Sequence, residues 1–126
     1  MVAVAGAVSE NDLIKRILMA LSERGHRAFR NNTGMGWAGH AQQWLDGSVL
    51  VRYARPLRAG LCEGSSDIIG WTADGKFLAI EVKCGRAPVT PAQRAFLRAV
   101  HEAGGRAGIA YTVEDAIQIA KREKTW

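Results

Sequence analysis

The sequence predicts an α/β fold in which a mixed β-sheet is flanked by helices, in the order α-β-β-β-α-β-α. Three observations favour this fold class: apolar residues recur at helical spacing, short apolar runs stand between turn residues, and an Asp-Gly pair joins two of those runs. The chain has 126 residues, which is enough for one hydrophobic core. We therefore expect residues 1–126 to form one domain.

The first helix is expected from Ser9 to Glu23. Ser9 is suited to cap it, and Asp12 stands where the acid of a capping box belongs. Apolar residues then form one stripe at helical spacing: Leu13, Ile14, Ile17, Leu18 and Leu21. Gly25 ends this segment.

Two more helices are expected over residues 91–103 and 113–122. The first follows Thr90, has a proline at its first position, and ends at a Gly-Gly pair. The second follows Thr112 and has Asp115 three residues later.

The expected strands are residues 27–31, 49–54, 67–72, 77–83 and 106–111. The pair Asp74-Gly75 joins two of them and is a strong hairpin signal. Residues 33–47 are rich in glycine and tryptophan, and we expect a loop or an irregular hairpin there. Residues 56–66 are expected to form another loop.

The charge balance favours a polyanionic partner. Seventeen Lys and Arg against twelve Asp and Glu give a net charge of +5, and the excess lies within residues 15–60. Arginine, which forms a planar fork toward phosphate, supplies most of the cations. Nucleic acid is the expected partner, although a solvated basic surface would explain the same charges.

Several classes are disfavoured. No apolar run approaches the ~20 residues that a membrane span needs, and residues 1–8 lack the basic start of a secretory signal. Two cysteines are too few for a disulfide scaffold. We expect a cytoplasmic protein of a bacterial or phage-infected cell, associated with the nucleoid, with no membrane contact and no organic cofactor.

Three ionisable residues carry the strongest functional signal. Glu81 and Lys83 are two positions apart in a predicted strand, so they share one face of it. Asp67 begins the partner strand of the hairpin, which can bring its carboxylate near Glu81. Two such carboxylates suit Mg²⁺, and a lysine beside them can orient a water or offset charge on a phosphate. The alternative is a Glu81–Lys83 salt bridge with Asp67 as a turn residue.

The segments around these residues resemble one known family. Gly64-Ser65-Ser66-Asp67-Ile68-Ile69-Gly70, Ala79-Ile80-Glu81-Val82-Lys83 and Thr90-Pro91-Ala92-Gln93 are similar to the VRR-Nuc family of the PD-(D/E)xK nucleases. The resemblance extends over about residues 9–122. Ser66 departs from it, because it stands where the superfamily name has proline.

This resemblance implies a restriction-endonuclease-like core and Mg²⁺- or Mn²⁺-dependent hydrolysis of DNA. It makes Asp67 and Glu81 metal ligands together with the Val82 carbonyl, and Lys83 the catalytic lysine. Glu10 precedes the apolar stripe at helical spacing, and related resolvase-like nucleases have a glutamate in this helix. Glu10 is therefore a candidate metal ligand, or an acid that the helix dipole favours.

Gln93 has two interpretations. The resemblance makes it an active-site residue that contacts the lysine or a phosphate. Its position makes it the third residue of a capping box with Thr90. We expect it to serve both roles only by alternating between them.

Candidate DNA contacts are spread over the chain: Arg30, Asn31, Asn32, Arg52, Arg55, Arg94 and Arg98. The asparagines could instead supply turn chemistry, and Arg98 could pair with Glu102 one helical turn away. Trp37 and Trp44 could stack on bases or form a dimer contact.

The function predicted first is a divalent-metal-dependent endonuclease. Stand-alone members of the family resemble Holliday-junction resolvases, which implies a homodimer that acts on branched DNA. The second hypothesis is a nuclease-like fold that binds DNA without cutting it. A nuclease acting on RNA is a third.

Overall fold

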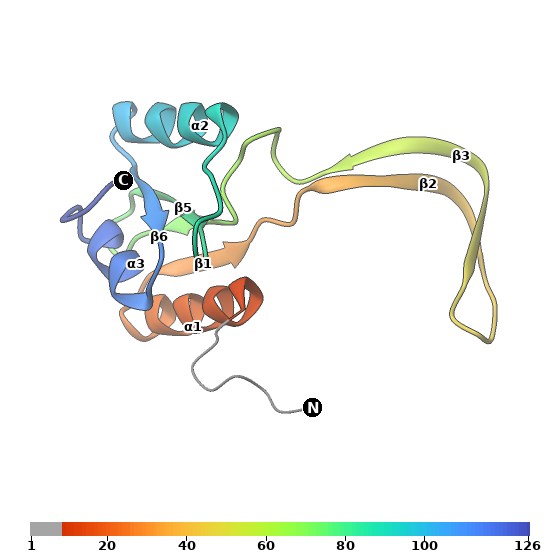
Figure 1. Cartoon of the computed structure of the whole chain (residues 1–126), viewed down its shortest axis with the longest axis horizontal. Coiled ribbons are helices and arrows are strands. Elements are labelled where there is room, and N and C mark those ends of the chain that lie inside the picture. Colours follow the sequence, from red (N-terminus) through yellow and green to blue (C-terminus); the bar gives the residue numbers. More distant parts are fainter. Residues whose placement is uncertain (1–8) are drawn as a thin grey trace.

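The computed structural model describes residues 9–126 (Figure 1). Residues 1–8, in which no secretory signal was expected, lie outside the described residues. The elements are α1 (Glu10–Glu23), β1 (Arg27–Arg30), β2 (Gly34–Gln43), β3 (Val49–Ala59), β4 (Ile68–Trp71), β5 (Phe77–Val82), α2 (Pro91–Glu102), β6 (Arg106–Ala110) and α3 (Val113–Ala120).

The main sheet has four strands in the order β1-β4-β5-β6. β4 pairs antiparallel with both β1 and β5, whereas β5 and β6 are parallel and are connected through α2. α1 and α3 pack together on one face of the sheet, and α2 packs on the other face over β5 and β6 (Figure 1). Around this sheet the order is α1-β1-β4-β5-α2-β6-α3, which confirms the predicted α/β class, and β2 and β3 add a two-stranded sheet between β1 and β4.

The core follows from the alternation of side chains along β5. Leu78, Ile80 and Val82 are fully buried in one cluster with the apolar stripe of α1 and with α3. Ala79 faces the opposite side, where it packs with Leu97 of α2. Because neighbouring residues of a strand point to opposite faces, Glu81 lies on the α2 side of the sheet.

All three helices begin at the expected caps. Ser9 Oγ accepts a hydrogen bond from the Asp12 backbone N–H at 3.1 Å. α2 and α3 have complete capping boxes, in which the side chain at the third position also accepts from the cap residue. The last two helices end one and two residues earlier than predicted, at Glu102 and Ala120.

For the segment between β1 and β4, the sequence prediction was right about a strand over residues 49–54 and wrong about the extent of the strands around it. The predicted loop or irregular hairpin is largely β2, the predicted strand over residues 49–54 is part of β3 outside the main sheet, and β3 continues through Ala59 into the predicted loop. We call this β2–β3 hairpin the arm, because it stands clear of the rest of the molecule (Figure 1). Glycine has low intrinsic preference for strands, so pairing with β3 rather than local propensity decides β2. The pair Asp46-Gly47 in the connecting turn was the available signal.

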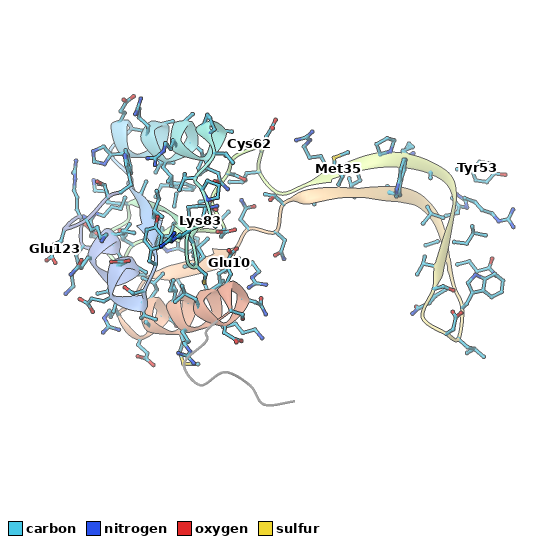
Figure 2. The ribbon with its side chains drawn as sticks, in the orientation of Figure 1. Glu10, Met35, Tyr53, Cys62, Lys83 and Glu123 are labelled. Atoms are coloured by element: carbon cyan, nitrogen blue, oxygen red, sulfur yellow. The ribbon has the colours of Figure 1, made fainter. Side chains whose placement is uncertain are left out.

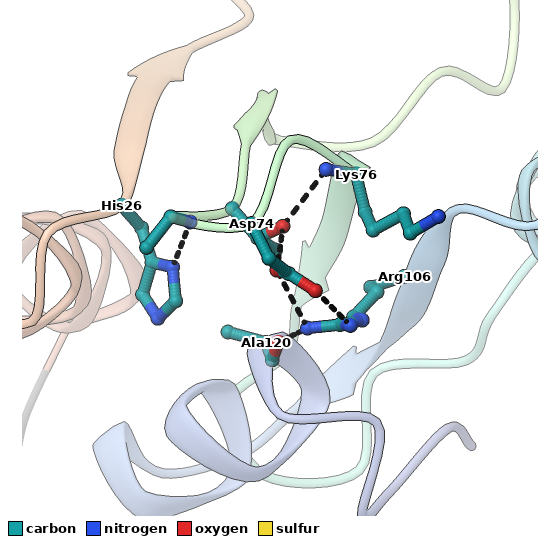
Figure 3. A network of polar contacts seen from close by, with 7 residues as sticks. His26, Asp74, Lys76, Arg106 and Ala120 are labelled. Carbon is teal, nitrogen blue, oxygen red and sulfur yellow. Dashed lines mark hydrogen bonds and ion pairs between the residues drawn. The ribbon is translucent and has the colours of Figure 1, made fainter.

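A polar network attaches the β4–β5 turn to the elements around it (Figure 3). The Ala73 N–H donates to His26 Nδ1 at 2.9 Å, and Arg106 donates to the Asp74 carboxylate and to the Ala120 carbonyl. Burial lowers the pKa of His26, more than the nearby Asp74 raises it, which keeps the ring neutral and able to accept. This anchoring holds the hairpin that carries the candidate site. No helix within residues 9–126 is long and apolar enough to cross a bilayer.

Candidate active site

Asp67 and Glu81 meet at one end of the β4–β5 hairpin. Ile68 pairs with Ile80 in the antiparallel ladder, so the residues just beyond that pair, Asp67 and Glu81, come together. The Val82 N–H donates to Asp67 Oδ2 at 2.8 Å, which fixes the Asp67 carboxylate against the end of β5. The convergence expected from the hairpin is therefore present in the structure.

Lys83 lies against the same carboxylate. Its Nζ is 3.6 Å from Glu81 Oε1, and the two side chains are only 11% and 4% exposed. The Lys83 N–H also donates to the Ala110 carbonyl at 3.0 Å, which ties the residue to β6. Burying this ammonium group is costly unless it is paired, so Glu81 and Lys83 depend on each other.

Gln93 contacts both the helix cap and the site, with the two ends of one amide. Its Oε1 accepts from the Thr90 N–H at 2.9 Å, and its Nε2 donates to Glu81 Oε1 at 3.1 Å. The expectation that Gln93 would alternate between the two roles was wrong, because a carboxamide has an acceptor and a donor that point in different directions.

Glu81 is a buried acid with a strongly raised pKa. Its Oε2 atom is buried and has no hydrogen-bond partner. The pKa of Glu81 is raised to about 8: burial is the largest cause, the Asp67 carboxyl and Glu10 act in the same direction, and Lys83 opposes them. A buried acid with a raised pKa, an unpaired oxygen and a second acid beside it is typical of a functional site.

Glu10 approaches the site from α1. It is exposed, not buried in the apolar stripe, but together with Asp67 it lines a cavity of about 360 Å³ beside the site. We call the described residues outside the arm the body. In Figure 2, Glu10 and Lys83 lie toward the side of the body from which the arm leaves. Within residues 9–126, no group of three or more His, Cys, Asp or Glu side chains is placed to hold a metal ion. Glu10 is therefore near Asp67 and Glu81 without completing a three-acid cluster.

Asn31 holds the segment that leads into Asp67. Its N–H donates to the Asp67 carbonyl at 2.7 Å, and its Nδ2 donates to Ser65 Oγ and to the Ser66 carbonyl. Both serines are buried, and sequence reasoning did not give them a role. The signal was a run of small polar residues directly before a candidate ligand.

Gly64 allows that segment to approach α2. Its φ is +82°, and a Cβ at this position would lie 2.5 Å from the Ala92 backbone. Any larger residue would separate the Asp67 segment from the helix that carries Gln93.

The candidate DNA contacts fall into three groups. Arg30 and Asn32 line the cavity beside Asp67, and Arg30 is hydrogen-bonded to Asn11. Arg94 and Arg98 are exposed on α2, and within the described chain Arg98 forms no ion pair with Glu102. Arg52 and Arg55 lie on the arm, which stands clear of the rest of the molecule (Figure 1). The structure thus brings Arg30, Asn31 and Asn32 to the site and leaves the other four on separate surfaces.

The donors at this site fit a divalent cation that prefers oxygen. Asp67 and Glu81 offer two carboxylates, and the buried, unpartnered Glu81 Oε2 is an atom that a cation would satisfy. Mg²⁺ is bound through one or two carboxylates and keeps several waters, so a third acid is not required. The cavity shared by Asp67 and Glu10 leaves room for those waters.

These features define the class of protein: an α/β domain with a nuclease-like core, whose paired acids and lysine meet at one end of a central hairpin. The family described as the VRR-NUC domain matches residues 9–114. The chain belongs to this family, and that membership implies a nuclease-type domain. A search of the curated proteins finds no match to the chain.

Proposed function

We propose that the protein is a divalent-metal-dependent deoxyribonuclease that cuts phosphodiester bonds within branched or structured DNA during replication or repair. The observation that carries this proposal is the convergence of Asp67 and Glu81 beside the buried Lys83, with Glu81 Oε2 left without a partner. Such work would take place in the cytoplasm, at the nucleoid.

Asp67, Glu81 and the Val82 carbonyl would hold Mg²⁺ or Mn²⁺, with Glu10 supporting the site through water. A cation bound there supplies a Lewis acid and a water of lowered pKa. Lys83 would orient that water and offset the charge that develops on the phosphate. Gln93 would hold the Glu81 carboxylate in position by its 3.1 Å hydrogen bond.

Two surfaces support DNA as the substrate. Arg30, Asn31 and Asn32 line the cavity next to Asp67 and would contact a phosphate adjacent to the one that is cut. Arg94 and Arg98 on α2 and Arg52 and Arg55 on the arm would track the backbone further away. A homodimer would place two such sites on a branched substrate, one for each strand.

A nuclease-like module that binds DNA without cutting it is the alternative. The mutual arrangement of Asp67, Glu81 and Lys83 favours the enzyme, because binding alone gives no reason to bury Glu81 with an unpaired oxygen. If the protein is instead a nuclease that acts on RNA, the same assay would show faster cleavage of the RNA substrates than of the DNA substrates.

The test is cleavage of labelled junction, flap, splayed-arm, duplex and single-stranded DNA, with matching RNA, in the presence of Mg²⁺ or Mn²⁺. We expect cleavage of branched DNA, its loss in EDTA, and a decrease of at least ~100-fold in Asp67→Asn, Glu81→Gln and Lys83→Ala.

Glu102→Gln is the matched control, because it removes an exposed acid of α2 that lies outside the site. It should cut like the parent, and circular dichroism should show that every variant is folded. The proposal fails if the three site variants cut as well as the parent. Salt-sensitive DNA binding without divalent-cation uptake in calorimetry would favour the non-catalytic module.

A further inference from the structure

The arm exposes more apolar surface than a hairpin in water should. Large side chains along it are about half exposed or more, including Met35 at 65%, Trp37 at 64% and Val49 at 55%. An isolated two-stranded hairpin is at best marginally stable in water. Figure 1 shows the arm standing away from the body, so the body does not cover these side chains.

The register of the arm separates its side chains into two faces. Trp37 pairs with Pro56, Ala41 with Val51, and Gln43 with Val49, so Met35, Trp37, Val49 and Val51 share one face, which we call the apolar face. His40 pairs with Arg52, and Ala38 pairs with Arg55. The opposite face, which we call the arginine face, is therefore the one that carries His40, Arg52 and Arg55.

A β-bulge bends the arm and shapes its apolar face. Gly39 stands opposite Tyr53, whose φ of +55° marks the irregularity, and a Cβ on Gly39 would lie 2.6 Å from the Arg52 carbonyl. Residues from both sides of this bulge, Trp37 with Val49 and Val51, line one hollow of about 330 Å³. The bend is visible in Figure 2, where Tyr53 lies at the turning point and Met35 nearer the body.

The body has an uncovered apolar surface of its own. α2 packs over β5 and β6 and leaves the β1 and β4 half of that sheet face open. Ala79 faces α2, and Phe77 shares that face because it lies two residues away on the same strand. Trp71 pairs with Phe77, Ile69 pairs with Ala79, and Phe29 pairs with Ile69. Phe29, Trp71 and Phe77 therefore all lie on the α2 side. They are 53%, 51% and 45% exposed, and the Phe29 and Trp71 rings are in contact at 5.7 Å. We call these three residues the aromatic patch. The adjoining hollow of about 480 Å³ is lined by Phe77, Phe96 and Val100.

We propose that the arm of each copy docks on the body of a second copy, with its apolar face over the aromatic patch, in a reciprocal two-fold dimer. This inference rests on the homodimer proposed above and names the surfaces that form it. The two-fold axis repeats this contact, so the apolar face and the aromatic patch of both copies are covered in the dimer.

The exposed area agrees with a dimer interface. In the proposed dimer each copy contributes both surfaces, and their six large apolar side chains are 45% exposed or more: Met35, Trp37 and Val49 on the apolar face, and Phe29, Trp71 and Phe77 in the aromatic patch. Since a fully buried aromatic side chain covers roughly 150–250 Å², these half-exposed side chains present on the order of 600 Å² of apolar surface in each copy. The largest apolar patch of a typical monomer is about 300–600 Å², and a standard interface buries about 800 Å² per partner including its polar rim, so this area suits the core of a dimer interface.

DNA is a poor match for the apolar face. Protein surfaces that bind DNA are polar and strongly positive, whereas the apolar face has one cation, Arg58, at its base. The arginine face has the complementary charge. In the proposed dimer it remains open to DNA while the apolar face is covered.

Analytical ultracentrifugation of the full chain tests the inference. We expect a dimer for the parent, and an increase of at least ~30-fold in the dimer dissociation constant for Val51→Lys and for Trp71→Lys. Each change puts a charge on an apolar contact that the two-fold axis repeats. Arg52→Gln combined with Arg55→Gln is the matched control on the other face of the same arm, and should leave the dimer unchanged. Thermal unfolding of each variant shows whether its body is folded.

Cross-linking identifies the surfaces independently. In a Cys62→Ser, Cys84→Ala background, we expect a short dimaleimide to join a Trp37→Cys copy to a Trp71→Cys copy, and to join neither variant to itself. Cross-linking of Trp37→Cys to itself would show arm-to-arm packing and overturn the inference.

The outcomes separate this inference from the proposed function. A dimer that survives both lysine variants overturns the docking and leaves the homodimer standing. A monomeric parent overturns both the docking and the homodimer, but not the nuclease assignment, which the cleavage assay decides.

Discussion

Gln93 shows how one residue can link local structure to a reactive group. Its carbonyl oxygen completes the cap of α2, and its amide nitrogen holds Glu81 Oε1. The cap therefore positions the site, because the helix that begins at Thr90 and the acid on β5 share one carboxamide. The corresponding residue of α3, Asp115, contacts instead the backbone N–H groups of Tyr111 and Thr112 and the Lys124 side chain.

Replacing Gln93 by Glu separates the two roles. A carboxylate keeps the acceptor for the Thr90 N–H but has no hydrogen to donate, and it places a like charge beside Glu81. We expect cleavage to fall ~10–100-fold, as for other residues that orient a metal ligand, with little change in the melting temperature.

Gln93→Ala is the comparison variant, because it removes both hydrogen bonds. It should lose activity and also about 1 kcal/mol of stability, since the cap is no longer complete. Full cleavage by Gln93→Glu would show that Gln93 acts only as a capping residue.

Glu81 should make stability depend on pH when no cation is present. The pKa of Glu81 is about 8 in the folded chain against an ordinary 4.5, so the folded state retains a proton that the unfolded state has lost between those values. Stability from this group is complete below about pH 4.5 and is lost as pH rises through about 8. In EDTA, we expect the melting temperature of the parent to fall relative to Glu81→Gln between pH 5 and 8, as scanning calorimetry would measure.

A divalent cation should restore the melting temperature of the parent at high pH but not that of Glu81→Gln. Only the parent has a carboxylate at position 81, on which a bound cation can take the place of the proton. Parallel pH curves for the two proteins would contradict the raised pKa and its assigned cause, burial.

At the scale of elements, the arm is the feature that local patterns predicted least well. The β2 partners of Arg52 and Arg55 are two residues apart, and the bulge at Gly39 brings both arginines to the same side. Simple alternation would put residues 52 and 55 on opposite faces of a strand. The arginine face therefore exists only as a result of the bulge.

Neutralising this face should weaken DNA binding in a way that salt reveals. For Arg52→Gln combined with Arg55→Gln, we expect a several-fold loss of affinity that is similar for all sequences. The slope of log K against log salt should decrease by about one for each phosphate that the protein no longer neutralises. Fluorescence anisotropy over a range of salt concentrations measures both quantities.

Lys121→Gln removes an exposed cation near the end of α3, away from the arm, and serves as the control. An equal change of slope in that variant would indicate a nonspecific effect of net charge instead of a contact made by the arm.

At the scale of the whole molecule, the proposed dimer predicts paired cuts. A dimer with two active sites should cut both strands of a cruciform plasmid within one binding event and linearise it. A mixed dimer of one parent copy and one Glu81→Gln copy should cut one strand only. We therefore expect co-expressed, doubly tagged mixed dimers to yield nicked circles in place of linear plasmid, as an agarose gel would show.

Parent dimers and Glu81→Gln dimers purified in the same way give the two limits of this assay. If mixed dimers linearise the plasmid as the parent does, the two cuts come from separate encounters, and pairing of sites within a dimer is wrong.

The sequence by itself determined the helices, the central hairpin and the sharing of one strand face by Glu81 and Lys83. These features depend on caps, turns and periodicity, which act over a few residues, and for that reason the helix boundaries agree with prediction within two positions. The approach of Asp67 to Glu81 was also predictable, since an Asp-Gly turn sets the register of the hairpin that joins them.

Only the tertiary structure decided the rest, because it depends on groups that are distant in the chain. Packing of α2 against β5 brings Gln93 to Glu81, and burial there, together with the adjacent Asp67 carboxyl, raises the pKa of Glu81 to about 8. Asn31 meets Ser65 and Ser66 across more than thirty residues. The arm, whose glycine-rich first strand has no strong local preference, forms through its pairing with β3, and long-range pairing of this kind cannot be read from local periodicity.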